Sequence, residues 1–565
     1  MRKIINDPQT FVDEVMEGIF AAHSDEVRTA TGDNRTLVRV DSPAAGRVGI
    51  VTGGGSGHLP FFLGYVGRGL CSAVAIGNVF SSPSSAQIYA ASRAVASDAG
   101  LLYLYGNYGG DVYNFDLAAD LCRADGIPVS TVLGADDILS APADKAETRR
   151  GVAGLVLVYK VAGAAADQLW SLPEVTRVAQ KAADATRTMG VGLSPTILPA
   201  AGEATFTLDD GEMEVGVGIH GEQGVHRGPL ETADEITDRF LVELDRELSF
   251  SEGQRVAVLV NGLGSTPLEE LYVVYRRVHS ELEARGVTIA RKYVGEYVTS
   301  LEMAGASLSI MVLDDELEEL INEPASSPFF RQGSLQPVAD NGAGTGASTP
   351  PPPIVEGAAT PAVTRTGTPS TLRAALLAGL PSMQQHIDEL RELDAALGDG
   401  DLGITVGAGS AAVVAALEEL PADADAASVI RSAAAAFAAA NPSTFAALVG
   451  SGLLGGAESL TSGTDLDRDA VAPFLQAVFD RISERGGAKL GDKTLLDVLH
   501  PVIVELATSS GAPDARDRVR TAAASAVETS AALQSARGRA AWQGERTVGQ
   551  KDPGAVAVLR FVEAF

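Results

Sequence analysis

The stretch "RVGIVTGGGSGHLP" (residues 47–60) combines a short β-rich apolar run with a cluster of glycines and a histidine. Similar runs recur along residues 1–330, between segments whose apolar residues repeat at helical spacing. Most of them end in Gly or Asp, as strands do where the loops of an α/β sheet carry function. The recurrence predicts an α/β region with strand-like runs "LLYLYGN" (101–107), "IPVSTVLG" (127–134), "GLVLVYKVAG" (154–163), "RVAVLVNGLG" (255–264) and "SLSIMVLDD" (307–315).

A chain of 565 residues is too long for one hydrophobic core, because cores stop growing at roughly 250–300 residues. We expect an α/β region over 1–330, with subdomains of about 1–190 and 191–330 that divide where "MGVGLSPTILPA" (189–200) interrupts the helical pattern. Residues 331–370 are rich in Pro, Gly, Ala and Thr and predict a linker. Residues 371–565 have almost wholly helical spacing and predict an all-α bundle or barrel of six to eight helices.

The composition restricts the partners and the compartment. A formal net charge of -30 argues against nucleic acid or an anionic membrane, since phosphate binding relies on Lys and Arg. Cys71 and Cys122 lie in no CxxC or Cys/His cluster, which fits a reducing compartment and offers no zinc site. The first residues lack the apolar core of a signal peptide, and the apolar stretch 428–456 is interrupted by Arg431 and Asn441. We therefore expect a cytoplasmic protein with no membrane span.

Three segments of the α/β region could carry chemistry. The glycines before His58 would let a ligand approach the backbone, although a plain strand-to-helix turn would also use them, and the Walker A ending is absent. In "YGNYGGDVYNF" (105–115), Asp111 is either a helix cap or, if it faces His58, a partner in proton transfer. In "GVGIHGEQGVHR" (216–227), His220 stands among glycines that leave its ring uncrowded.

The helical region contains a loop of carboxylates. "LDAALGDGDLGITV" (393–406) sets Asp394, Asp399 and Asp401 around a helix end and a glycine turn. Oxygen ligands that converge from a bend suit a hard cation that also binds phosphates, but solvated acidic turns have the same composition. Both interpretations stay open on these residues alone.

Together these motifs resemble the dihydroxyacetone kinase family. The α/β region resembles its substrate-binding domain through "GGGSGH" (53–58), "NVFSSP" (78–83), "GNYGGDVYNF", "RRGVAGLVLVYKVAGAAA" (149–166) and "GVGIHGEQGVHR", in that order. Residues 370–565 resemble its nucleotide-binding domain through the carboxylate loop, "VGSGLLGG" (449–456), "GDKTLLDVL" (491–499) and the segment 536–558. The resemblance implies an ATP- and Mg²⁺-dependent kinase that phosphorylates a terminal hydroxyl of a short-chain ketose, and it implies a homodimer.

The resemblance also implies roles for individual residues. The family holds the substrate ketone as a covalent hemiaminal on the histidine that corresponds to His220, while His58 and Asp111 match the residues that bind and deprotonate the accepting hydroxyl, with Asp111 as general base. His226 matches no family role, so we expect it to be structural. By the same resemblance the substrate-binding residues are Gly55, Ser56, Gly57, Asn107 and Gly110; the metal ligands are Asp394, Asp399 and Asp401; and the nucleotide-binding residues are Thr405, Gly450, Ser451, Gly452, Thr494, Arg539 and Asp552.

Two positions depart from the family pattern. Leu59 stands where dihydroxyacetone-active members have a carboxylate, and Gly106 stands where they have a lysine. Both changes remove a charged side chain that could contact the substrate, and glycine at 106 is expected to leave more room. We therefore expect a longer ketose such as erythrulose. The alternatives are a ketone-sensing regulator without kinase activity, or an additional FAD-AMP lyase activity. If the protein is a kinase, the helical domain must dock on the α/β domain, either within one chain or across a dimer.

Overall fold

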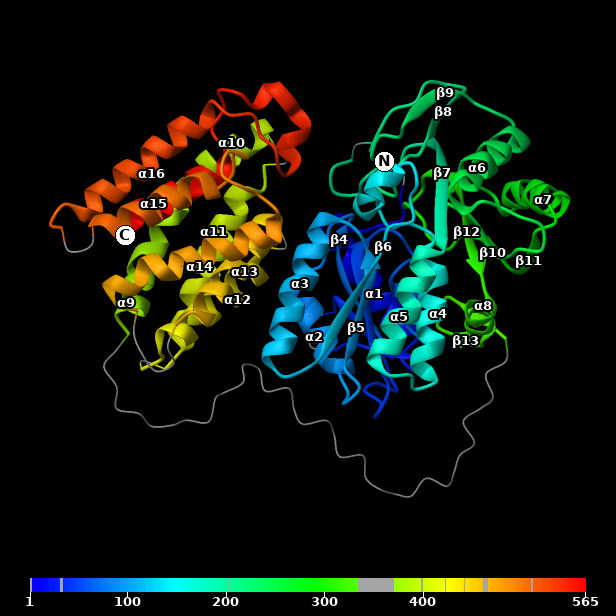
Figure 1. Cartoon of the computed structure of the whole chain (residues 1–565), viewed down its shortest axis with the longest axis horizontal. Coiled ribbons are helices and arrows are strands. Elements are labelled where there is room, and N and C mark those ends of the chain that lie inside the picture. The colour runs from blue at the N-terminus through cyan, green and yellow to red at the C-terminus, as the bar shows by residue number, and fades with distance from the viewer. Residues whose placement is uncertain are drawn as a thin grey trace, which may run out of the picture. The chain divides into compact units, whose positions relative to one another are not determined.

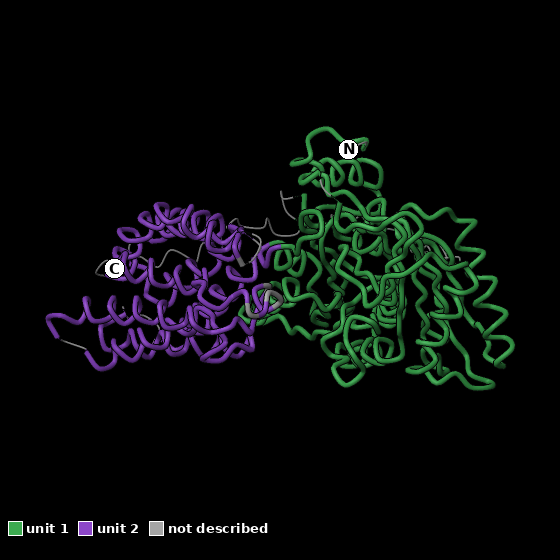
Figure 2. The backbone as a smooth tube through the Cα atoms, turned by 90° about the horizontal axis from the view of Figure 1, so that it is seen from above, with its two compact units in different colours: residues 1–83, 87–354 green, residues 84–86, 355–565 purple. Residues whose placement is uncertain are grey.

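The computed structural model describes residues 3–30, 34–202, 204–333, 370–397, 400–421, 423–441, 443–460, 466–509 and 512–565. Contacts between Cα atoms divide the chain into two units, 1–83 with 87–354 and 84–86 with 355–565 (Figure 2). The first unit is an α/β region and the second is helical (Figure 1), so the predicted fold class is confirmed. Within the described ranges, every hydrophobic core cluster belongs to one unit only.

The first sheet has the strand order β1-β2-β4-β3-β5-β6, in which β4, β3, β5 and β6 run parallel. Helices cover both faces: α2 and α3 pack on one face, and α1, α4 and α5 contribute to the core on the other. The elements are α1 (Phe11–Ala22), β1 (Val27–Arg28), β2 (Thr36–Arg39), β3 (Gly49–Ser56), η1 (Leu63–Tyr65), β4 (Ala73–Val79), α2 (Ser85–Val95), β5 (Leu101–Gly106), α3 (Gly109–Ala124), β6 (Val129–Gly134), η2 (Ala143–Thr148), α4 (Leu155–Asp167) and α5 (Leu172–Asp184).

The second sheet has the order β11-β10-β12-β7-β8-β9 and is antiparallel except for β10 and β11. Helices α6 and α7 pack on one face, and the other face shares a core with α4, α8 and the first sheet. The elements are β7 (Thr186–Ser194), β8 (Glu212–Val215), β9 (His226–Pro229), α6 (Ala233–Leu248), β10 (Arg255–Gly262), α7 (Leu268–Ala284), β11 (Thr288–Gly295), β12 (Ala304–Leu313), α8 (Asp315–Asn322), β13 (Ala325–Ser326) and β14 (Arg331–Gln332).

Three predictions of local structure need correction. The run 154–163, which we expected to be a strand, lies almost wholly in helix α4, whose residues up to Ala166 are buried. A fully buried segment is apolar in either conformation, so its periodicity cannot distinguish the two. The second sheet begins with β7 at Thr186, before the expected subdomain boundary near 190, and β14 extends the first unit into the expected linker. Residues 334–369 of that linker lie outside the described ranges.

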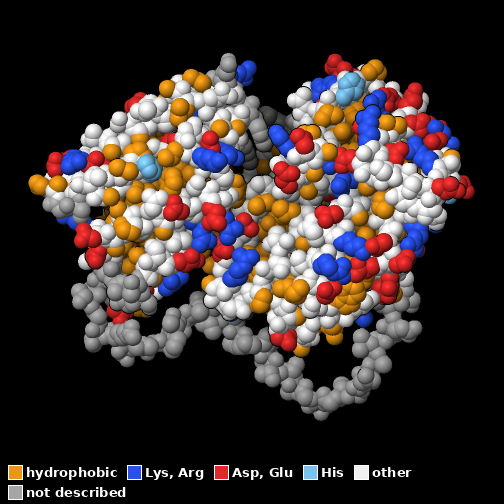
Figure 3. Space-filling model, in the orientation of Figure 1, with side chains coloured by type: hydrophobic (Ala, Val, Ile, Leu, Met, Phe, Trp, Pro, Cys, Tyr) orange, Lys and Arg blue, Asp and Glu red, His pale blue; other side chains and the backbone are white. Residues whose placement is uncertain are grey.

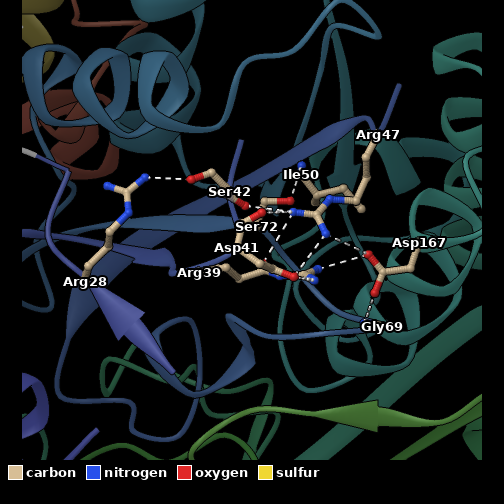
Figure 4. Close-up of polar contacts among 9 residues, drawn as sticks. All are labelled: Arg28, Arg39, Asp41, Ser42, Arg47, Ile50, Gly69, Ser72 and Asp167. Atoms are coloured by element: carbon tan, nitrogen blue, oxygen red, sulfur yellow. Dashed lines mark hydrogen bonds and ion pairs between the residues drawn. The ribbon is translucent and has the colours of Figure 1, made fainter. Parts of the chain in front are cut away.

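A partly buried ion cluster joins the end of β2 to the end of α4 (Figure 4). Arg39, only 3% exposed, donates to Asp41 at 2.7 and 2.8 Å and to Asp167 at 3.0 Å. Asp167 also accepts a hydrogen bond from the backbone N–H of Gly69 at 2.6 Å, and Arg47 lies 3.4 Å from Asp41. Although burial opposes it, the hydrogen bonds and charges of the two arginines lower the pKa of Asp41 to about 2. The cluster is paired within itself and lies apart from the candidate site described below.

The second unit is a ring of helices in which neighbours in sequence pack on one another from α10 to α17, and α17 returns to α10 and α11. Arg560 on α17 closes the ring through a two-pronged pair with Glu389 on α10. The described ranges contain more helices than predicted, partly because residues 371–397 split at Pro381. The elements are α9 (Thr371–Gly379), η3 (Leu380–His386), α10 (Ile387–Leu397), α11 (Leu402–Glu419), α12 (Ala426–Ala440), α13 (Thr444–Glu458), α14 (Arg468–Gly486), α15 (Leu496–Ser509), α16 (Ala515–Ala531), η4 (Arg539–Thr547) and α17 (Pro553–Ala564).

The charge on the surface and the burial of the apolar helices can be compared with the expectation of no membrane span. On the face shown in Figure 3, acidic and basic side chains are mixed. Helix α11 is long and apolar enough to span a membrane by length and composition, but half of the window that meets this criterion is buried within the fold. Core helices satisfy the same criterion, and α11 packs against α10, α12 and η3. The apolar stretch 428–456 forms parts of α12 and α13, as predicted.

Candidate functional site

His58 follows the end of β3, where the chain makes a glycine turn. Gly57 has a φ of +97°, which favours glycine, and its carbonyl accepts a hydrogen bond from the N–H of Leu301 at 2.8 Å. The His58 ring places Nδ1 2.8 Å from the carbonyl oxygen of Thr299. Because a carbonyl can only accept, Nδ1 carries the hydrogen. Burial, reinforced by the nearby His220, lowers the pKa of His58 to about 3, so the ring is neutral and Nε2 has a lone pair.

His220 lies in the loop between β8 and β9, with its side chain 23% exposed. Its Nδ1 is 2.8 Å from Oε1 of Glu222, and its backbone N–H donates to Oε2 of the same carboxylate. Although burial opposes it, these contacts and the charge of Arg150 lower the pKa of Glu222. An ionised carboxylate favours the hydrogen on Nδ1 and leaves the lone pair of the ring on Nε2.

Asp111 stands in the first turn of α3 and is buried. Burial raises the pKa of Asp111 to about 7, although a hydrogen bond from Ser82 and the nearby His220 oppose the shift. Asp111 does not stand at the N-cap of α3, which is Tyr108, and the hydrogen bond that acts on its carboxylate comes from the side chain of Ser82. A carboxylate with this pKa is suited to general base catalysis near neutrality.

The rings of four residues gather around this loop. The ring centroids of His58 and His220 are 5.0 Å apart, Phe80 stacks on His58 at 4.8 Å, and Tyr108 meets His220 edge to face at 5.1 Å. Three buried polar atoms in this neighbourhood have no hydrogen-bond partner: Nε2 of His58, Oδ1 of Asp111 and the hydroxyl of Tyr108. Buried polar groups are normally satisfied, so unpaired atoms at one place mark a site for a polar ligand.

The residues predicted to bind substrate divide into two groups. The backbone at 55–57 leads directly to His58. An added Cβ at Gly55 would lie 2.7 Å from the backbone nitrogen of Ser81, so this segment packs closely against the backbone at Ser81. Asn107, in contrast, donates its amide hydrogens to the carbonyls of Glu147 and Arg149 at 2.9 and 2.8 Å. It holds the 147–149 segment in place. Gly110 likewise lies against Ser82, where a Cβ would be 2.6 Å from the hydroxyl oxygen.

Gly106 does not open the space that we expected from its missing side chain. A Cβ atom at this position would lie 3.1 Å from the carbonyl oxygen of Gly151 and 3.3 Å from the ring of Tyr108. The ring therefore covers the place next to Gly106. Leu59 packs against the main core of the first unit.

The predicted metal ligands that the structure describes lie close together in the second unit. Oδ2 of Asp394, on α10, accepts a hydrogen bond from the N–H of Leu402 at the start of α11 at 3.1 Å. Burial, and then the charge of Asp394, raise the pKa of Asp401, which directly precedes α11. Asp399 lies outside the described residues, and among those described no group of three or more His, Cys, Asp or Glu side chains gathers around a common point. Two carboxylates at a helix N-terminus form a donor set that fits a cation with bound phosphates.

Asp552 caps α17, with Oδ1 2.7 Å from the N–H of Ala555. Burial raises the pKa of Asp552 to about 7, and the charges of Asp497 and Asp394 act in the same direction. Asp497 accepts a hydrogen bond from the N–H of Thr494 at 2.7 Å. Asp552 is therefore near both Asp394 and Asp497, and Thr494 joins this group through its hydrogen bond to Asp497. The side chain of Arg539 lies outside what the structure describes.

The predicted nucleotide-binding residues Gly450, Ser451 and Gly452 do not form the glycine-rich loop that the resemblance implies, because they lie inside helix α13. Helical N–H groups there are used within the helix, and Gly452 instead allows close packing, since an added Cβ would lie 2.7 Å from Ile482. Ser451 keeps a buried hydroxyl without a partner. Thr405 is fully buried, and its hydroxyl is engaged by Asn441 at 2.6 Å and Ser443 at 3.3 Å.

Our sequence reasoning missed Glu222, Arg150, Tyr108 and Thr299. Glu222 had a usable signal, because it lies two residues after His220 and a carboxylate at that distance can reach the ring. Thr299 had none, since it is 241 residues from His58.

Comparisons with known proteins agree with this architecture. Residues 17–329 match the Dak1 domain model and residues 396–565 match the DAK2 domain model. An L-erythrulose kinase of Pectobacterium atrosepticum is 38% identical, covering 100% of this chain and 96% of that protein. A D-erythrulose kinase of Mycolicibacterium smegmatis is 37% identical, covering 99% and 97%. The crystal structure of the dihydroxyacetone kinase of C. freundii in complex with AMP-PNP and Mg²⁺ is 26% identical, covers 100% and 99%, and has a TM-score of 0.55.

The fold and the two matches define a protein in which a Dak1 domain and a DAK2 domain are joined in one chain. The chain belongs to the dihydroxyacetone kinase family.

Proposed function

We propose that this protein is an ATP-dependent kinase that phosphorylates a terminal hydroxyl of a short-chain ketose, erythrulose or dihydroxyacetone, held covalently on His220. The observation that carries the proposal is the position of His220: its Nδ1 lies 2.8 Å from Oε1 of Glu222, and its ring lies 5.0 Å from the ring of His58, whose buried Nε2 has no hydrogen-bond partner. A small ketose offers few atoms for tight binding, so a covalent bond to its carbonyl supplies both affinity and selection for ketones.

In the first step, Nε2 of His220 donates its lone pair to the ketone carbon. A C–N bond forms, the π bond of the carbonyl breaks, and its electron pair moves to oxygen. As the positive charge develops on the ring, the Nδ1 proton passes to the Glu222 carboxylate and from there to solvent, and the oxygen takes a proton from solvent, so the hemiaminal forms without change of net charge. Glu222 accepts the Nδ1 hydrogen bond and stabilises the positive charge that develops on the ring.

In the second step, a terminal hydroxyl loses its proton as it attacks the γ-phosphorus of ATP, and the bond from that phosphorus to the β,γ-bridging oxygen breaks, so ADP leaves. Asp111 is the general base, and the neutral His58 offers a second acceptor at Nε2. Asp394, Asp399 and Asp401 would hold Mg²⁺, which neutralises charge on the phosphates of bound ATP. Ser451, Thr494 and Asp552 are candidates for nucleotide contacts. We further propose a homodimer in the cytoplasm.

The four-carbon ketose is the preferred substrate in this proposal. It is supported by relatives named for both L- and D-erythrulose, each matching nearly the whole chain. Gly106 adds no room for a fourth carbon, because the Tyr108 ring lies next to that position.

The test is release of ADP from Mg-ATP by the full chain with dihydroxyacetone, D-erythrulose, L-erythrulose or glycerol. We expect turnover with the ketoses and none above background with glycerol, which lacks a carbonyl. His220→Asn should lower ketose-dependent kcat/KM by at least about 100-fold, because loss of a covalent catalyst is costly. His226→Asn, at the exposed start of β9, is the matched control and should leave turnover unchanged.

Other outcomes would identify the alternatives. Ketose binding without ADP release would favour a regulator that senses the ketone. Release of AMP from FAD in the absence of ketose would indicate an additional lyase activity. Equal turnover by the His220→Asn variant would overturn the covalent mechanism while leaving the kinase assignment.

A further inference from the structure

Two adjacent arginines, Arg149 and Arg150, point to different partners. Arg149 is almost fully buried and makes a two-pronged pair with Glu247 on α6, at 2.5 and 2.7 Å. Arg150 donates from Nε to Oδ2 of Asp137 at 3.0 Å and from Nη2 to the carbonyl oxygen of Gly216 at 3.0 Å, and Nη2 forms an ion pair with the same Oδ2 at 2.8 Å. The second arginine therefore joins the segment after β6 to the loop that carries His220.

Arg150 also faces the carboxylate that holds the His220 ring. Its Nη1 is 3.7 Å from Oε2 of Glu222, the same oxygen that accepts the backbone N–H of His220. The other oxygen accepts from Nδ1 of the ring. A continuous series of charged and hydrogen-bonded groups thus runs from Asp137 through Arg150 and Glu222 to His220.

Gly218 shows that the loop is shaped around this pairing. A Cβ atom at this position would overlap Oε2 of Glu222 and Nη1 of Arg150. Its φ is not in the left-handed region, so backbone conformation does not demand glycine there. The close approach of the two charged groups does.

We infer that Arg150 is a positioning residue for His220, acting through Glu222. The inference rests on the proposed covalent capture of the ketone. Arg150 holds the Glu222 carboxylate in place and ionised, which keeps the hydrogen of His220 on Nδ1 and directs the lone pair of Nε2 toward the ketone. Asp137 orients the guanidinium from the other side. A neutral or displaced Glu222 would leave the ring free to turn or to change tautomer.

The experiment measures the hemiaminal directly. The full chain is mixed with dihydroxyacetone labelled with ¹³C at the carbonyl carbon, and ¹³C NMR records the bound carbon, whose resonance moves far upfield when the carbonyl becomes tetrahedral. The variants are Arg150→Met, Arg150→Lys and Gly218→Ala, each with ADP release measured in parallel. Arg277→Met is the matched control, because Arg277 makes a comparable two-pronged pair with Asp238 between α6 and α7.

We expect Arg150→Met to lower the hemiaminal fraction at subsaturating ketose about tenfold, since a charge-assisted contact is worth roughly 1.5 kcal/mol. KM should rise more than kcat falls. Arg150→Lys should recover part of the loss by restoring the charge, and Gly218→Ala should reproduce the loss without removing any charged group. Arg277→Met should match the unmodified protein.

The outcomes separate this inference from the proposed function. If the unmodified protein forms no tetrahedral carbon, the covalent mechanism itself fails. If it does, and both Arg150→Met and Gly218→Ala retain the same fraction, the positioning role is overturned. An equal loss in Arg277→Met would also overturn it, because the effect would then be general destabilisation. Should Arg150→Met fail to fold, Arg150→Gln decides the question, because it removes the charge of Arg150 alone, whereas Gly218→Ala also displaces Glu222.

Discussion

At the scale of single residues, Asp111 is the general base in our proposal, and burial raises its pKa to about 7. A base works in its ionised form, so ketose kinase activity should rise as the pH passes upward through about 7. The Asp111→Asn variant should lose at least about 100-fold in kcat and should no longer show this rise. The measurement is the pH profile of kcat and of kcat/KM for the preferred ketose between about pH 5.5 and about pH 9, a range that brackets the raised pKa of Asp111.

The stability of the same variant provides a control. Asp111 has a folded pKa above its ordinary value of 3.8, so the folded state loses stability as the pH rises from about 4 to about 7. Asp111→Asn should therefore be more stable than the unmodified protein to urea at pH 8, and the difference should vanish at pH 4. Lower activity together with lower stability at pH 8 would contradict the role that we assign.

At the scale of elements, α10 and α11 cross at Gly403, and this crossing brings Asp394 next to the start of α11. An added Cβ at Gly403 would overlap the carbonyl oxygen of Ile387 and lie 2.9 Å from the backbone nitrogen of Arg391. Backbone atoms cannot yield as a flexible side chain can. Gly403→Ala should therefore separate the helices and lower the free energy of unfolding by about 1–3 kcal/mol, measured by urea denaturation.

The neighbouring residue on the same turn offers the matched control. Ile404 is 56% exposed, and Ile404→Ala should cost well under about 1 kcal/mol. Gly403→Ala should also weaken protection of α11 amides against hydrogen exchange. A fully stable Gly403→Ala variant would show that the helices can shift without loss.

At the scale of the whole molecule, the core clusters of the described residues are separate for the two units. Calorimetry should therefore show two unfolding transitions. Mg-AMP-PNP should raise the midpoint temperature of only one transition, and a ketose that of only the other. Each ligand should stabilise its unit by about 2.7 kcal/mol when it is present at 100 times its dissociation constant. A single transition that rises with either ligand would show that the units unfold together.

Much of this arrangement was predictable from the sequence because it is encoded over a few residues. The alternating strand and helix patterns, the composition of 331–370 and the helical spacing beyond it specify the fold class and the order of the domains. The motifs around His58, Asp111, His220 and the carboxylate loop identify the family. The prediction failed where local pattern is ambiguous: the buried run 154–163 is a helix, and the glycines at 450–452 serve helix packing.

The sequence by itself therefore determined the class of the fold, the family and the chemical types available to the site. Only the tertiary structure decided what those groups can do. The tautomer of His58 depends on a carbonyl 241 residues away, the hydrogen bond of the His220 ring depends on Glu222, which Arg150 faces, and the raised pKa of Asp111 depends on the atoms that exclude water from it. Proton positions and pKa values follow from neighbours in space, and those neighbours come from distant parts of the chain.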